Sequence, residues 1–208
     1  QLAMEGATIT IMAQDAVINF LKTQKWIKNV IAYDGEVPEF DYHCYLISLA
    51  KILEWEPKMD TQTFPYLNVD NPKKNSLNKK STIGIVTTAP KELSNYKQII
   101  LPDGALDNFF DSEKHNVIDL TKFDNLDDLI YTIDNCDLVI TIEGIVPHIA
   151  GSLNKQAWIL LPAVPKHTWD LNYKSSSPWY PSVELFRQEL LGDWSSVMSE
   201  IKKRLSNV

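Results

Sequence analysis

The sequence predicts an α/β protein built on parallel sheets, and three observations support this. Short β-branched apolar runs alternate with helical periodicity along most of the chain, which is the order of parallel strands joined by helical crossovers. The segment 137–142 (DLVITI) is almost wholly apolar, as expected of a central strand covered on both faces. A stretch rich in Pro, Lys and Asn at 56–81 separates two halves. We therefore expect a partial N-terminal domain over 1–70, a linker over 71–81 and a doubly wound domain over 82–208.

The N-terminal half contains one predicted strand–helix–strand unit. Residues 7–13 and Asn29–Ala32 are short apolar runs typical of strands. Between them a helix is expected over 16–23, with Asp15 as its N-cap. Such an order indicates a parallel pair, because parallel strands need a crossover connection. A further helical pattern covers 40–53.

The same alternation in the C-terminal half predicts five strands and four helices. The strands are expected at 82–87, 98–101, 116–120, 137–142 and Ala157–Leu161. The helices are expected at 106–111, Leu126–Asn135, 147–153 and 194–205. The last helix lies in a tail that begins at Ser182, and no strand is predicted between this residue and the helix.

Composition and charge exclude several classes of protein. Hydrophobic residues make up 44% and charged residues 23%, as in an ordinary globular protein. The net charge of −7 disfavours a nucleic-acid partner, because few phosphates could be neutralised. No apolar run reaches the ~18 residues of a membrane span. Cys44 and Cys136 are far apart and lack metal-ligand spacing, so we expect no disulfide and a cytoplasmic location.

In open α/β sheets, ligands bind beyond the carboxyl ends of the strands, and one candidate loop there carries Thr87, Thr88 and Lys91. Two hydroxyls and an ammonium can donate hydrogen bonds to the oxygens of a diphosphate. The alternative is a Thr-rich strand end after which Pro90 starts a helix. The sequence leaves both possibilities open.

A second candidate loop runs from Glu143 to His148 and leaves the most apolar predicted strand. Gly144 permits close approach of a ligand to the backbone. Pro147 is tolerated in the first turn of a helix, so the next helix starts here and its free N–H groups would face the ligand. His148 could add a further donor. Alternatively, His148 caps or packs against a neighbouring loop.

A third candidate is the aromatic segment 169–180, which ends in the Pro-flanked pair Trp179-Tyr180. A rigid aromatic pair could form a wall for a base or a sugar ring. Alternatively, these aromatic residues lock the tail onto the domain. The helix over 126–135 begins among three carboxylates that we interpret as favourable to its macrodipole: Asp124, Asp127 and Asp128.

At these loops the sequence resembles glycosyltransferase family 9, the bacterial heptosyltransferases, and the related glycosyltransferase domains attached to tetratricopeptide proteins. Residues 123–161 are similar to the family's helix followed by DLVI-x-x-D-[TS]-x-x-x-H-x-A-[GA]-A-L-x-K-P-x-W and an apolar strand. The matching positions are His148, Ala150, Gly151, Leu153, Lys155 and Trp158. The segments 6–22, 38–53 and 177–194 resemble the tetratricopeptide-linked branch.

The resemblance implies a GT-B-like fold of two Rossmann-like parallel-sheet domains, the N-terminal one incomplete, with a nucleotide-diphosphate sugar bound between them. By position, it places the donor diphosphate against Thr87, Thr88, Lys91, Gly144, Ile145 and His148. It places Phe123 against the nucleobase and keeps Trp169 as one aromatic of a W-R-W motif. Glu143 stands where the family usually has Asp, Gly144 where it has Thr or Ser, and Gln156 where it has Pro.

The implied function is transfer of a sugar from this donor to an unknown acceptor, such as a glycan, a lipid-linked sugar or a protein, without a metal or a cofactor. Helix N-terminal amides, Lys91 and His148 would offset the charge of the leaving diphosphate. The family's catalytic base and its Gly-rich acceptor loop precede the position of Gln1. Because the sequence starts with Gln1 rather than Met, we expect it to be cut from a longer protein with a tetratricopeptide or other N-terminal region.

Two other functions remain to be weighed. A catalytically silent relative would keep the fold as a binding or assembly module. The missing front part of the family pattern, together with Glu143, Gly144 and Pro147, motivates this alternative. A nicotinamide-dependent dehydrogenase is disfavoured, because no G-x-G-x-x-G follows any predicted strand. Titration with nucleotide sugars separates the first alternative from a transferase.

Overall fold

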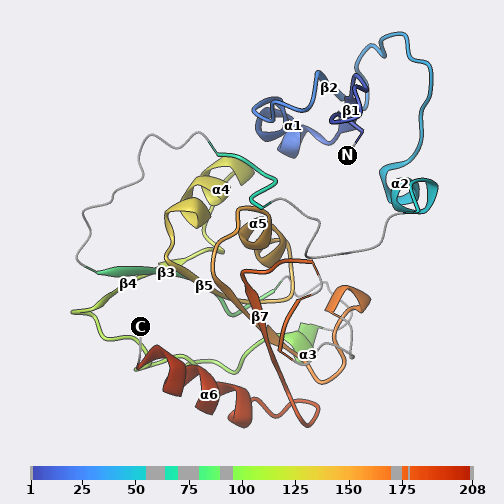
Figure 1. Cartoon of the computed structure of the whole chain (residues 1–208). Helices are drawn as coiled ribbons and strands as arrows, with labels where there is room; N and C mark the ends of the chain where they lie inside the picture. The colour runs from blue at the N-terminus through green and yellow to red at the C-terminus, as the bar shows by residue number, and fades with distance from the viewer. Residues whose placement is uncertain are drawn as a thin grey trace.

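The computed structural model describes residues 2–54, 64–69, 80–89, 96–169, 175–177 and 179–206. The chain forms a five-stranded parallel sheet and a separate two-stranded parallel sheet, which together give an α/β protein with a Rossmann-like arrangement (Figure 1). The large sheet contains β3 (Ser81–Val86), β4 (His115–Asp119), β5 (Leu138–Ile142), β6 (Ala157–Leu161) and β7 (Val183–Arg187). The small sheet contains β1 (Thr10–Ala13) and β2 (Asn29–Ala32).

The large sheet has the spatial order β4-β3-β5-β6-β7, and every neighbouring pair is parallel. Chain order reverses between β3 and β5: the chain moves from β3 outward to β4, and then returns to the other side of β3. Such a reversal is the topological switch point of an open α/β sheet, beside which ligands bind at the carboxyl ends of the strands. This topology therefore locates a binding edge next to the ends of β3 and β5.

Helices cover both faces of the large sheet (Figure 1). On one face lie α4 (Leu126–Asn135) and α5 (Val146–Ser152), and on the other lie α3 (Tyr96–Ile99) and α6 (Ser195–Leu205). The strand β5 supplies both cores, since Val139 packs in the first and Ile140 in the second. Because neither face meets water, all five residues of β5 are buried, as the apolar sequence of this strand predicts.

The helix α4 shows how local sequence fixes one of these elements. Its N-cap residue Asn125 is extended, and its side chain accepts a hydrogen bond from the Asp128 N–H at 2.9 Å. Leu129, Ile130 and Ile133 recur at helical spacing and are buried on the sheet side. The predicted bounds of this helix are confirmed.

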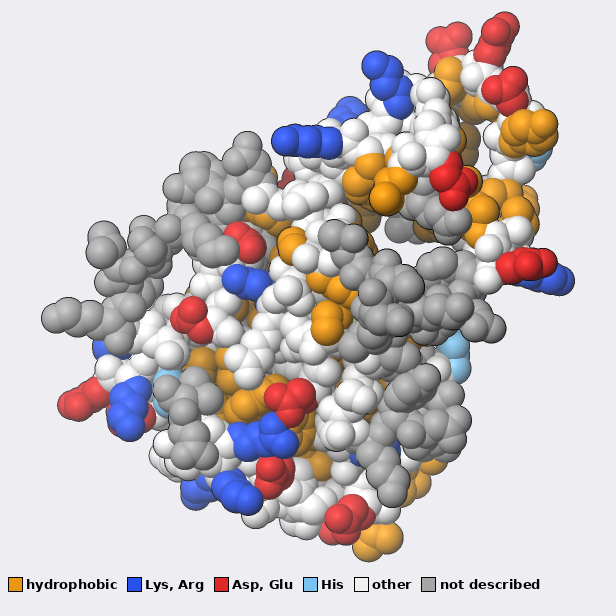
Figure 2. All heavy atoms as spheres, viewed as in Figure 1, with side chains coloured by type: hydrophobic (Ala, Val, Ile, Leu, Met, Phe, Trp, Pro, Cys, Tyr) orange, Lys and Arg blue, Asp and Glu red, His pale blue; other side chains and the backbone are white. Residues whose placement is uncertain are grey.

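The N-terminal lobe consists of β1, α1 (Asp15–Lys22), β2 and α2 (Leu46–Ile52), and its helices have no buried residues. Large apolar side chains such as Tyr42, Tyr45 and Ile47 are exposed there. Figure 2 shows hydrophobic side chains gathered on this lobe, at the upper right of the view. A two-stranded sheet has little surface for burial, so few of the lobe's apolar groups are covered.

The short segment 64–69 links this lobe to the large domain. The Gln24 side chain pairs with the Asn68 backbone in both directions, accepting from its N–H at 3.1 Å and donating to its carbonyl at 3.0 Å. On the other side of the segment, the N–H groups of Tyr66 and Leu67 donate to the Ser152 carbonyl in α5. Phe20 of α1 also packs against the core beneath α4 and α5.

Several predicted elements differ from the structure. The strand expected at 98–101 is wrong, because α3 ends there as a helix. The helix expected at 106–111 is also wrong: the chain forms turns, with Asn108 in the left-handed region at φ 60°. The strand β7 was not predicted within the tail.

The bounds of two N-terminal helices also differ from expectation. Only Leu46–Ile52 of the pattern at 40–53 is helical. In α1 the N-cap is Gln14 rather than Asp15, and no side chain caps the helix. Asp15 instead lies in the first turn, where its charge favours the helix dipole.

The structure also bears on membrane spans, metal ions and disulfides. No helix among the described residues combines the length and the hydrophobicity that a membrane crossing requires. Within the same parts of the chain, no three His, Cys, Asp or Glu side chains gather in a way that could hold a metal ion. Cys44 is exposed and Cys136 is buried, and both thiols are free. Burial raises the pKa of the Cys136 thiol to about 11.

Candidate functional site

Four loops that carry predicted site residues meet at one edge of the large sheet. Thr87 and Thr88 follow β3, and Glu143 follows β5. These strands are direct neighbours, with Val86 opposite Thr141, so their carboxyl ends lie side by side at the switch point. Phe123 and Trp169 come after β4 and β6, which end at the same edge because the sheet is parallel. Lys91 lies outside the described residues.

The turn after β5 is open. Gly144 and Ile145 are exposed, and a Cβ added at Gly144 would meet no atom within 4 Å. None of the described residues accepts a hydrogen bond from the N–H groups of Gly144, Ile145 and Val146. The His148 N–H, in contrast, donates to the Ile145 carbonyl at 3.1 Å, and Pro147 has no N–H. The backbone donors available to an anion therefore come from residues 144–146.

Glu143 is buried and bonded within the protein, unlike a side chain that is exposed to a ligand. Its side chain is 4% exposed, and its Oε1 accepts a hydrogen bond from the Lys166 N–H at 2.7 Å. No described residue forms a hydrogen bond with its Oε2. Burial raises the pKa of Glu143, although the Lys166 N–H and the charges of Lys166 and Arg187 oppose this. Glu143 thus ties the end of β5 to the loop that follows β6.

His148 is held by two aromatic side chains. Its ring stacks on Trp169, with centroids 5.1 Å apart and planes inclined by 17°. Its Nδ1 lies 3.0 Å from the Tyr180 hydroxyl, within hydrogen-bond distance. Burial, followed by the nearby charge of Lys166, lowers the pKa of His148. The imidazole is therefore neutral at neutral pH, and it would act on an anion as a hydrogen-bond donor rather than as a cation.

Tyr180 reaches His148 by packing on the backbone of α5. A Cβ at Gly151 would lie only 2.2 Å from the Tyr180 ring, so a glycine is needed at this point. Tyr66 stacks on Tyr180 at 6.4 Å between centroids, and its hydroxyl lies 2.8 Å from Ser152 Oγ. Burial, followed by the hydrogen bond with Tyr66, raises the pKa of Tyr180, so its hydroxyl stays protonated. The sequence did not predict that Tyr66 and Ser152 support His148.

The third predicted loop is largely structural. Trp169 is 1% exposed, and its carbonyl accepts a hydrogen bond from Arg187 of β7 at 3.0 Å. The Trp179 indole donates to the Thr168 carbonyl at 2.8 Å. This geometry favours the alternative in which the aromatic residues lock the chain onto the domain. Phe123 is half-buried and packs against the core that contains α4 and α5.

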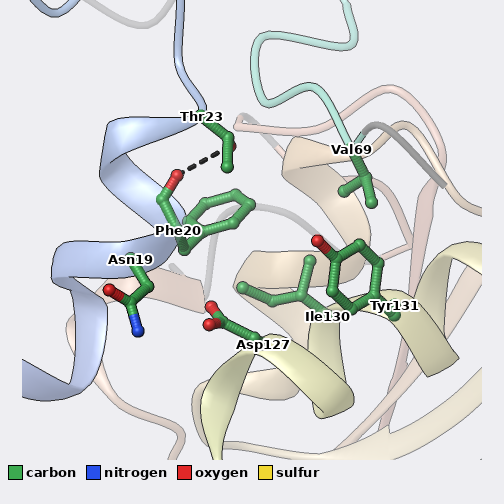
Figure 3. A pocket seen from close by; sticks show the side chains of 7 residues that line it. All are labelled: Asn19, Phe20, Thr23, Val69, Asp127, Ile130 and Tyr131. Carbon is green, nitrogen blue, oxygen red and sulfur yellow. Dashed lines mark hydrogen bonds between the residues drawn. The ribbon is translucent and has the colours of Figure 1, made fainter.

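Two hollows lie away from this edge. The first, which we call the α1–α4 hollow, has a volume of about 170 Å³ and is lined by Asn19, Phe20, Thr23, Val69, Asp127, Ile130 and Tyr131 (Figure 3). The second has a volume of about 360 Å³ and is lined by Pro65, Leu67, Asn68, Val69, Asp134, Leu153, Asn154 and Lys155. None of the predicted site residues that the structure describes lines either hollow. Asp127 was predicted only to favour the dipole of α4.

Comparison of the chain with protein families, with curated proteins and with solved structures finds no match.

Proposed function

We propose that the protein is a glycosyltransferase of the GT-B type that binds a nucleotide-diphosphate sugar at the carboxyl ends of β3 and β5. The observation that carries the proposal is the open turn at Gly144, with its available backbone N–H groups, beside Thr87 and Thr88 at the switch point. Backbone donors that point beyond strand ends are suited to a diphosphate. The resemblance to glycosyltransferase family 9 covers the same two loops.

The proposed mechanism stabilises the leaving diphosphate by preorganised donors. Because Tyr180 is protonated, its hydroxyl can donate to His148 Nδ1, which places the ring proton on Nε2. His148 then offers a neutral N–H to a phosphate oxygen, next to the amides of residues 144–146. Removing one such donor typically costs roughly 10²-fold or more in turnover. The N-terminal lobe would contribute to acceptor binding.

Calorimetry with UDP, ADP and GDP sugars tests the proposal. In the titration we expect the protein to prefer one nucleobase. In a separate assay of sugar transfer, we expect the His148→Ala variant to lower turnover by roughly 10²-fold. The matched control is His43→Ala, which removes an exposed imidazole from the N-terminal lobe and should leave the affinity for the nucleotide sugar unchanged. Unchanged turnover in His148→Ala would remove this residue from the site.

A catalytically silent binding or assembly module is the second candidate function. It is favoured by the burial of Glu143 and Trp169, which stand at motif positions of the family in the resemblance and here hold the fold together. Absence of binding by every nucleotide sugar in the same titration would favour this alternative. Binding without turnover would instead support the donor site. The catalytic base would then have to come from another part of the protein.

A further inference from the structure

The α1–α4 hollow lies where the N-terminal lobe meets the large domain. Figure 3 shows side chains from α1, from α4 and from the segment 64–69 converging on one space. Ligand sites occur preferentially at interfaces between structural units, because side chains from both units can surround the ligand. This hollow is independent of the proposed donor site.

Most of the lining is apolar. The rings of Phe20 and Tyr131 come from opposite sides, and Ile130 and Val69 complete the apolar part (Figure 3). The volume of about 170 Å³ is close to the roughly 150 Å³ of an engineered cavity that binds benzene. The hollow therefore suits a ligand with an apolar body of about the size of benzene.

Of the described residues that line the hollow, only Asp127 is charged. Its Oδ1 is buried and has no hydrogen-bond partner among the described residues. The Thr23 hydroxyl in the same lining is engaged elsewhere, because it donates to the Phe20 carbonyl at 2.7 Å and accepts from Gln24 at 2.8 Å. A buried carboxylate oxygen without a donor is costly, and a cation that supplies N–H groups removes this cost.

We propose that the α1–α4 hollow binds a small organic ammonium ion. The ammonium donates to the Asp127 carboxylate, and the apolar body lies between Phe20 and Tyr131, whose rings also attract a cation. Among the described residues, no Lys, Arg or His lines the hollow, so none of them repels a positive ligand. Both a free organic amine and the lysine side chain of a polypeptide supply such an ammonium group.

The test is titration of the isotope-labelled chain, followed through its backbone amide resonances by NMR. The probes are benzylamine, its neutral isostere benzyl alcohol, and Nα-acetyl-lysine N-methylamide. We expect benzylamine to shift the amides of α1 and of the first turns of α4 with a Kd on the order of 1 mM, which is reasonable for so small a ligand. Tighter binding of the lysine derivative would identify a peptide lysine as the natural source, and tighter binding of benzylamine a free amine.

The variant Asp127→Asn keeps the shape of the side chain and removes its charge. It should weaken benzylamine by about ten-fold or more, as expected for loss of a charge-assisted hydrogen bond. The matched control Asp124→Asn removes a neighbouring exposed carboxylate outside the lining and should leave the affinity unchanged. The proposal is overturned if benzyl alcohol binds as well as benzylamine, if folded Asp127→Asn binds benzylamine as tightly as the parent, or if benzylamine well above about 1 mM shifts no lining amide.

Discussion

The two sheets of this protein are built from the same unit, a parallel strand–helix–strand crossover, yet their strands are covered very differently. In the large sheet, β5 and β6 are buried along their whole length between layers of helices. In the small sheet, β1 has one buried residue, Ala13, and α1 has none. The crossover therefore specifies which strands pair, whereas stability comes from covering both faces of the sheet.

The lobes also differ in what holds them in place. The large domain is stabilised by two hydrophobic cores, one on each face of its sheet. The N-terminal lobe is tied to it mainly through Phe20 and the pairing of Gln24 with Asn68. Elements with few buried apolar contacts open at lower free energy than a core. We therefore expect the small sheet to lose hydrogen-exchange protection before the large one.

The largest expected effect contrasts one isoleucine from each lobe. Ile140 in β5 is 0% exposed, and Ile47 in α2 is 92% exposed. Ile140→Ala should lower the free energy of unfolding by about 3–4 kcal/mol through lost burial and a cavity. Ile47→Ala should change it by less than about 0.5 kcal/mol. Urea unfolding of both variants measures the contrast, and equal losses would show that the lobes are equally well packed.

A second contrast lies within α5 and the turn before it. Gly151→Ala forces a methyl group into the Tyr180 ring and should cost about 2 kcal/mol of unfolding free energy. Gly144→Ala enters open space and should be nearly neutral in stability. Thermal unfolding of the two variants provides the measurement. A neutral Gly151→Ala would mean that Tyr180 does not pack as described, and would weaken the support of His148.

The connection between the lobes gives a smaller expected effect. Gln24 is 1% exposed and pairs with the Asn68 backbone twice. Gln24→Ala leaves two backbone groups without their partner and should cost about 1–2 kcal/mol. The loss should fall on the N-terminal lobe, and hydrogen exchange measures it residue by residue. Gln14→Ala, at an exposed position, is the matched control; equal protection in both variants would contradict the role of Gln24.

The smallest expected effect is a pH dependence at His148. Because its pKa is lowered by burial, the unfolded state binds a proton that the folded state does not, between the folded pKa and the unfolded value of 6.5. Stability from this group is therefore lost as the pH falls through 6.5, by at most about 1.4 kcal/mol per pH unit.

This pH dependence can be measured with His148→Gln as the reference. The unfolding free energy of the parent should fall more than that of the variant between about pH 7.5 and pH 5.5. Glu143, whose pKa is raised, changes stability in the opposite sense at lower pH. Since Glu143 is present in both proteins, its contribution cancels in the difference. Parallel pH profiles would show that His148 is not held as a neutral ring.

The sequence predicted correctly those elements that have a clear apolar pattern and flanking residues typical of the same element. The run at Leu138–Ile142 is apolar throughout, and Leu126–Asn135 has a helical stripe with a polar N-cap. The residues at 98–101 gave the wrong element, because a short apolar run does not distinguish a strand from a helix. The strand at Val183–Arg187 was missed because Glu184 and Arg187 interrupt its apolar pattern.

The candidate site could be predicted only in outline. Parallel topology brings Thr87, Thr88 and Gly144 to one edge, so strand order was sufficient for these residues. The support of His148 depends on contacts between distant segments, such as Tyr66 with Ser152 and Tyr180 with Gly151. No local pattern encodes such contacts, because they form only when the crossovers have packed. The burial of Trp169 agrees with the predicted alternative that the aromatic segment locks the tail onto the domain.

Mapping of nucleotide binding tests the central claim most directly. We would follow the backbone amides by NMR while adding UDP, ADP and GDP. Binding at the switch point predicts shifts at residues 87–89 and 143–148, with little change in β1 and β2. Shifts confined to other parts of the chain, or no saturable shift with any of the three nucleotides, would contradict the proposed donor site.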